Sequence, residues 1–259
     1  MNNVMALAGV VVKELYRRKD FYVLFVLTAL ITLILGSVNL FNDEQIVRYL
    51  KEICLLLIWL SSLVIAITTT ARQIPAERES RTIFPLLAKP VSRAELIGGK
   101  FMGCWLACGA ALLVFYFFYG VIVGSREHAL ALVPFLQAMW LHWMCLGIVV
   151  ALALLGSVVF TAPSSASTIC FIVVVGLLFA GQHLNQIAVN IGGARGTIVY
   201  ALYYIVPHLE FFDIRKTIIH NHDPINGFAV AGATLYGIVY ASTLLSVAWG
   251  LFRRKALTL

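Results

Sequence analysis

Six long apolar stretches, free of Asp, Glu, Lys and Arg, constrain the fold of this chain more than any other feature. They cover residues 21–40, 53–71, 101–123, 136–160, 165–184 and 227–252. A helix needs about 20 apolar residues to cross the hydrocarbon core of a bilayer. Of the 259 residues, 61% are apolar and 12% charged, whereas soluble domains hold roughly 25% charged residues. This excludes a soluble enzyme, a disordered chain and a disulfide scaffold, and predicts an all-α membrane protein with six transmembrane helices.

The positions of Lys and Arg indicate which way the six spans run. With the amino terminus inside, the inner flanks hold thirteen of the nineteen Lys and Arg residues and the outer flanks hold six. Cytoplasmic flanks of membrane proteins carry the excess of these residues. We therefore predict that both termini are cytoplasmic. The membrane is expected to be a bacterial or archaeal cytoplasmic (inner) membrane.

The segment before the first span, residues 1–20, has the period of an amphipathic helix. Its apolar face would consist of Val4, Leu7, Ala8, Val11, Val12 and Leu15. These positions recur at the spacing of one helix face. The pattern predicts a helix that lies in the cytoplasmic interface before the first span. The alternative is a basic flank that only follows the charge rule for orientation.

Residues 72–100 hold most of the polar side chains that a soluble partner would meet on the inner side. Pro75 can open a short helix, because its missing N–H is not needed in a first turn. Glu77 and Arg81 are then one turn apart and able to pair. From these residues we expect a short charged helix, with a solvated connector as the alternative.

The second half of this loop carries turn and helix-start signals. Pro85 and Pro90 prevent a continuous helix. Ser92 and Glu95 form an S-x-x-E capping box, which predicts a new helix that leads into the third span. The loop as a whole is therefore expected to be compact.

This loop resembles the cytoplasmic signature of the type-2 ABC exporter permeases. In that family an acidic-Arg-acidic element precedes a Thr and a leucine pair, and a Pro-x-Ser-Arg leads to Gly-Lys at the next span. The corresponding residues are Glu77-Arg78-Glu79-Ser80-Arg81-Thr82, Leu86-Leu87, Pro90-Val91-Ser92-Arg93 and Gly99-Lys100. Arg81 departs from the pattern, because many members carry a small residue there. The motif covers about thirty residues, while the topology covers the chain.

The resemblance implies a permease subunit that works with a separate ABC-type nucleotide-binding subunit. The chain has no G-x-x-x-x-G-K-[ST] phosphate loop, so ATP and Mg are expected on the partner, and no cofactor or catalytic residue in this chain. The family's coupling helix corresponds to residues 77–82, with the amino-terminal helix beside it. The residues implied in coupling are Glu77, Arg78, Glu79, Arg81, Thr82 and Arg93, flanked by Glu14 and Arg17. Further expected partners are membrane lipid and a second copy or a paralogue, but no nucleic acid.

Apart from His183 at the very end of the fifth span, His142 is the only imidazole in the spans, and the spans contain no acidic or basic side chain. Secondary transporters usually keep ionisable groups near the midplane, so an ion-driven carrier is disfavoured. We interpret His142 as a neutral histidine bonded to a neighbouring helix. The five cysteines are interpreted as small buried apolar residues.

Two groups of side chains are weak candidates for a substrate pathway. Thr68 and Thr69 close the second span and are placed to line an inner vestibule; alternatively, their hydroxyls bond to carbonyls of the preceding turn. Phe115 and Phe118 belong to an aromatic cluster at the outer end of the third span. That cluster fits either an apolar exit for amphipathic cargo or an interfacial aromatic belt.

The longest segment between spans, residues 185–226, is expected to be external. Its apolar part, residues 196–207, is too short to cross and predicts a re-entrant hairpin like that of the family. His220, His222 and Asp223 are interpreted as a polar turn, and no metal site is predicted.

We predict one permease domain, residues 1–259. It divides into an interfacial helix (1–20), spans 1 and 2 (21–71), a cytoplasmic coupling loop (72–100), spans 3 to 5 (101–184), an external re-entrant segment (185–226), and span 6 with a basic tail (227–259). Its expected function is to couple ATP hydrolysis by a partner to movement, in the export direction, of a hydrophobic or amphipathic substrate. The alternative is a scaffold or sensor that anchors an ATPase without transport.

Overall fold

A computed structural model describes residues 2–17, 26, 30–31, 34, 44–80, 92–127, 131–191, 206–220 and 222–254. These residues are almost entirely helical and include no strand, which confirms the all-α class. The elements are α1 (Asn2–Arg17), α3 (Glu44–Ala71), α4 (Gln73–Glu79), α6 (Arg93–Glu127), α7 (Leu132–Val159), α8 (Pro163–Ile191), the 3-10 helix η1 (Leu209–Phe212), α10 (Arg215–Ile219) and α11 (Gly227–Arg254).

Four of these elements are long and apolar enough to cross a membrane: α3, α6, α7 and α11. They contain the predicted second, third, fourth and sixth spans. The predicted fifth span lies in α8, whose described apolar part, Pro163–Phe179, is shorter than the other four. The predicted first span, residues 21–40, falls outside the described residues apart from four isolated helical positions.

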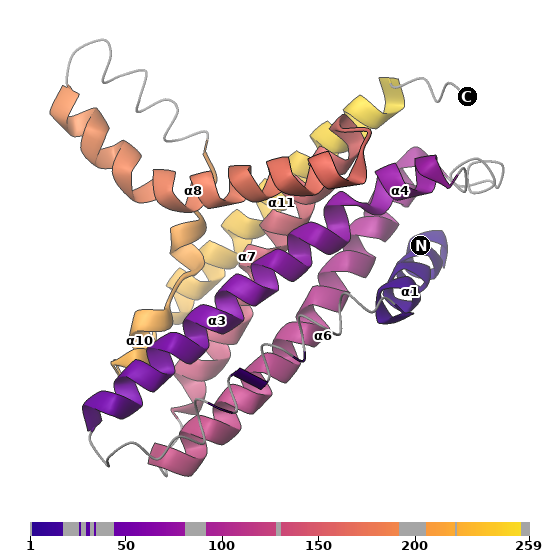
Figure 1. Ribbon diagram of the computed structural model, residues 1–259. Coiled ribbons are helices and arrows are strands. Elements are labelled where there is room, and N and C mark those ends of the chain that lie inside the picture. The colour runs from indigo at the N-terminus through magenta and orange to yellow at the C-terminus, as the bar shows by residue number, and fades with distance from the viewer. Residues whose placement is uncertain are drawn as a thin grey trace.

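Helix α7 is the centre of the bundle. It packs against α11, α3, α6 and α8, and most of its side chains, from Ala138 to Val158, are buried. Figure 1 shows α3, α6, α7 and α11 running alongside one another, with α8 crossing them at a steep angle. Helix α11 exposes most of its side chains, so it lies at the edge of the described bundle.

A reciprocal pair of tryptophans joins α6 to α7. The Trp105 indole N–H donates to the Trp143 carbonyl (3.0 Å), and the Trp143 indole N–H donates to the Trp105 carbonyl (3.3 Å). The two rings stack with centroids 4.6 Å apart. Each ring lies against a glycine of the opposite helix, Gly147 for Trp105 and Gly109 for Trp143. We call this contact between Trp105 and Trp143 the tryptophan clasp. The two glycines have no side chain and so leave room for the indole rings between the closely packed backbones of α6 and α7.

The segment before α11 packs onto the end of the bundle where α3 begins. The 3-10 helix η1 contacts α7 and α8, and α10 contacts α3 and α7. The Gln137 side chain exchanges two hydrogen bonds with the backbone of Ile225 (2.8 and 3.0 Å), which fixes the approach to α11. Most of the predicted re-entrant part, residues 196–207, lies outside the described residues.

Candidate functional site

Those of the residues implied in coupling that the structure describes gather at one end of the bundle, which we call the α4 end. There α1, α4, the start of α6 and the end of α11 lie close together, as Figure 1 shows at the right of the view. The described parts of the polar loop, residues 72–80 and 92–100, therefore belong to a larger assembly of four chain segments.

The helix expected around Pro75 exists, but its bounds differ from the prediction. Helix α4 begins at Gln73 and ends at Glu79, so it starts before Pro75 and ends before the predicted 82. Pro75 is tolerated as the third residue because the first intrahelical bond is donated by the Ala76 N–H, to Arg72. At the other end, the Ser80 hydroxyl donates to the Ala76 carbonyl (2.8 Å), a side-chain bond that competes with continued helix.

Lys100 of α6 joins α4 to the bundle. Its side chain is buried, with 3% of its surface exposed, and its Nζ lies 2.6 Å from Glu77 Oε1. The same ammonium donates to the side-chain oxygen of Gln73 at 3.2 Å. A buried charge is tolerated only where it is paired and hydrogen-bonded. The contact therefore holds α4 at a fixed place on α6.

Two glycines of α6 let α1 approach closely. A Cβ on Gly99 would lie 2.6 Å from Leu7 Cβ, and one on Gly103 would lie 2.7 Å from Val11 Cβ. No real Cβ is tolerated at such distances, so only glycine permits this helix separation. The amphipathic helix predicted before the first span is present, and its apolar face packs on α6. Its position in a membrane interface stays a prediction.

The start of α6 is stabilised by a capping box and by hydrogen bonds from the Arg93 side chain to α11. The Ser92 N–H donates to Glu95 Oε2 (2.8 Å) and the Glu95 N–H to Ser92 Oγ (3.2 Å), which confirms the predicted capping box. Arg93 Nη1 donates to the carbonyls of Phe252 (2.6 Å) and Arg253 (3.0 Å). Arg93 thus caps the end of α11, where a cation is favoured.

Comparison with known protein families identifies the family of this chain. The family described as ABC-2 family transporter protein matches residues 10–256, nearly the full chain. The chain belongs to the ABC-2 transporter family. Such proteins are the membrane component of an ABC transporter and not its ATPase, and the membership implies an ABC ATPase partner. The sequence matches none of the curated proteins with which it was compared.

The coupling residues implied by the resemblance occupy different environments in this ABC-2 permease. Glu77 faces Lys100, while Glu79 is exposed on the last turn of α4. Arg78 is half-buried, and within the described part of the chain its Nε and Nη2 have no hydrogen-bond partner. Glu14 is half-buried on α1. Arg81, Thr82 and the side chain of Arg17 fall outside the described residues.

The suggested pathway residues of the permease do not form one surface. Thr68 Oγ1 donates to the Val64 carbonyl (2.7 Å) and Thr69 Oγ1 to the Ile65 carbonyl (2.6 Å), as the alternative interpretation expected. Phe115 is buried and Phe118 is half-buried. Their role in a substrate pathway stays a prediction.

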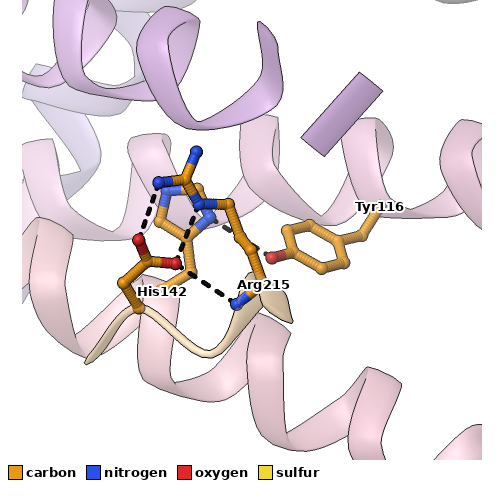
Figure 2. Close-up of polar contacts among 4 residues, drawn as sticks. Tyr116, His142 and Arg215 are labelled. Atoms are coloured by element: carbon orange, nitrogen blue, oxygen red, sulfur yellow. Dashed lines mark hydrogen bonds and ion pairs between the residues drawn. The ribbon is translucent and has the colours of Figure 1, made fainter. Parts of the chain in front are cut away.

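His142 lies at the centre of a polar cluster inside the bundle. Its Nε2 is 2.8 Å from Ser62 Oγ on α3, and its Nδ1 is 3.4 Å from the Tyr116 hydroxyl on α6. Because Ser62 donates its hydroxyl hydrogen to the Trp59 carbonyl, Nε2 must be the donor to Ser62 and Nδ1 the acceptor from Tyr116. These contacts confirm the predicted histidine bonded to a neighbouring helix. Figure 2 shows its contact with Tyr116.

An ion pair of the segment before α11 docks beside this cluster. Arg215 binds both carboxylate oxygens of Asp213 (2.8 and 2.6 Å), and its guanidinium lies 5.0 Å from the centre of the Trp59 ring. Burial raises the pKa of Asp213, but the hydrogen bonds and charge of Arg215 outweigh burial and hold that pKa below its ordinary value. Arg215 begins α10, and Figure 2 shows it in one view with His142 and Tyr116. Sequence reasoning missed this docking, because the signal is only a D-x-R spacing.

Proposed function

We propose that this permease couples ATP hydrolysis by a separate nucleotide-binding subunit to movement of a hydrophobic or amphipathic substrate, in the export direction. The site of coupling is the α4 end, and the membrane is the cytoplasmic membrane of a bacterium or archaeon. The single observation that carries the proposal is the attachment of α4 to α6 through Lys100 and Glu77. A short helix that is tied to the end of the bundle is suited to pass on force from a partner.

The charge distribution on α4 supports a docking role for its exposed end. Glu79 and Ser80 are exposed, and the half-buried Arg78 guanidinium keeps donors that no described residue uses. Charge-assisted hydrogen bonds are the strong ones at such an interface. The absence of acidic and basic side chains from the spans supports an apolar or amphipathic cargo over a hydrophilic ion.

The first prediction tests docking with Glu79→Lys. Glu79 is exposed, so the reversal should leave the fold intact but weaken ATPase binding at least tenfold through charge repulsion. The measurements are co-purification of the ATPase and the ATP turnover of the complex.

Asp223→Lys is the matched control, because it makes the same charge change at an exposed position before α11, at the opposite end of the bundle. Unchanged binding and turnover in Glu79→Lys would contradict docking at α4. Binding without any change of turnover on addition of lipid would favour the scaffold alternative.

A further inference from the structure

Lys100 contacts two residues of α4, which lie on successive turns of that helix. Its two partners, Gln73 and Glu77, are four residues apart and therefore lie on one face of α4. The ammonium lies 2.6 Å from Glu77 Oε1 and 3.2 Å from Gln73 Oε1. Contacts on two successive turns fix both the position and the direction of α4 relative to α6.

The adjacent residue of α6 holds α1. Gly99 lies directly under Leu7 and the Val4 carbonyl, so α1 and α4 meet α6 at two consecutive residues. Trp105, which is five residues after Lys100 on α6, contacts Trp143 of α7. Helix α4 packs directly on α7, α3 and α8, and Lys100 adds a polar link from α4 to α6.

We propose that Lys100 is a positioning residue for energy coupling, which makes α4 and α6 move as one rigid body. This inference rests on the proposed function, because it assumes that an ATPase displaces α4. Helix α4 cannot shift along α6 without separating an ion pair whose ammonium is buried and whose carboxylate is partly buried, which leaves two poorly compensated charges. Displacement of α4 is therefore passed to α6 through this pair, in addition to the packing of α4 on α3, α7 and α8.

The second prediction removes both charges together with Glu77→Gln and Lys100→Met. The double variant leaves no uncompensated charge, so it should fold, and the distance is measured on the complex that co-purifies with the ATPase. Spin labels at Ser80→Cys, the residue that follows α4, and at Phe117→Cys on α6, both exposed positions, report the distance between the end of α4 and α6. Labelled chains diluted with unlabelled ones exclude distances between copies, and the native cysteines described are all buried.

Pulsed electron–electron double resonance measures this distance in the nucleotide-free complex and in the complex trapped with ATP and vanadate. In the otherwise wild-type chain the distance should stay the same in both states. In the double variant it should shift on trapping by roughly 2–5 Å, the scale of helix shifts in allosteric transitions. The charge-exchanged pair, Glu77→Lys with Lys100→Glu, and the conservative Lys100→Arg should both restore the constant distance.

Other outcomes overturn the inference. A constant distance in the double variant would show that Lys100 is not needed for joint movement, and a shift in the otherwise wild-type chain would show that the two helices are not one body. A shift that persists in the charge-exchanged pair would assign the effect to packing and not to the ion pair. If no ATPase co-purifies with the unchanged permease, the proposed function fails first, and that failure is visible before any distance is measured.

Discussion

At the residue scale, His142 and Lys100 are the two buried side chains of this permease that matter most. Both lie on helices that can span a membrane, and both satisfy their polar atoms on other elements. The sequence predicted the environment of His142, because a lone imidazole in an apolar helix must find partners. It did not predict the environment of Lys100, which the sequence marked only as a basic residue of an inner flank and as part of the Gly99-Lys100 pair of the family signature.

The third prediction concerns His142→Leu. The leucine side chain fills about the same space as the imidazole, but the Tyr116 hydroxyl loses its acceptor. This loss should lower the free energy of unfolding by roughly 1–3 kcal/mol. Thermal unfolding of the purified permease measures the loss. His222→Leu is the control, because His222 is exposed, and it should have little effect. Equal losses in the two variants would mean that the buried hydrogen bonds contribute nothing.

At the scale of elements, small residues decide which helices approach one another. Gly99 and Gly103 admit α1, and Gly109 and Gly147 admit the tryptophans of the clasp. In both cases the missing Cβ is replaced by atoms of another helix, so the contact gains dispersion energy over a large area. The recurrence of small residues in the third span was visible in the sequence, but not which helix would use them.

The fourth prediction compares two glycines of the same helix. Gly103→Ala places a Cβ 2.9 Å from the Ala8 carbonyl oxygen, so it should force α1 away and cost about 1–3 kcal/mol. Gly98→Ala meets no atom within 4 Å and should instead stabilise the helix by roughly 0.5–1 kcal/mol. Thermal unfolding gives the sign of each change, and hydrogen exchange of residues 2–17 shows whether α1 has loosened. The prediction is wrong if both substitutions change stability in the same direction.

At the scale of the whole molecule, the bundle has two chemically different ends. The α4 end holds the capping box, the Lys100–Glu77 pair and the Arg93 cap of α11. The opposite end holds the turn with His222 and Asp223 before α11 and the start of α3. The excess of Lys and Arg predicts that the α4 end is cytoplasmic, and this orientation is open to a direct test.

The fifth prediction tests the orientation with Glu79→Cys and Asp223→Cys, one at each end of the bundle and both exposed. A maleimide that cannot cross the membrane, added to intact cells, should label Asp223→Cys and not Glu79→Cys. Permeabilised cells should give labelling of both, which controls for reactivity. The reverse pattern would place α4 outside and remove the basis for ATPase docking there.

The sequence by itself determined the properties that depend on local pattern and on solvent. Residues 101–123 and 136–160 were identifiable as membrane helices because apolar length and absence of charge are enough for transfer into a bilayer. Ser92 and Glu95 were identifiable as a helix start because the capping box closes within four residues. The short helix near Pro75 was also predicted, although its bounds were not, since helix ends depend on competing local bonds.

Only the tertiary structure decided which distant residues meet. Lys100 and Glu77 are 23 residues apart, and Arg93 and Phe252 are 159 apart, and no local periodicity encodes such pairs. The docking of Arg215 on Trp59 depends in the same way on the packing of α10 against α3. The physical reason is that burial and hydrogen bonding of these groups are properties of the assembled bundle, and the charge of a lysine finds its partner only after the helices have packed.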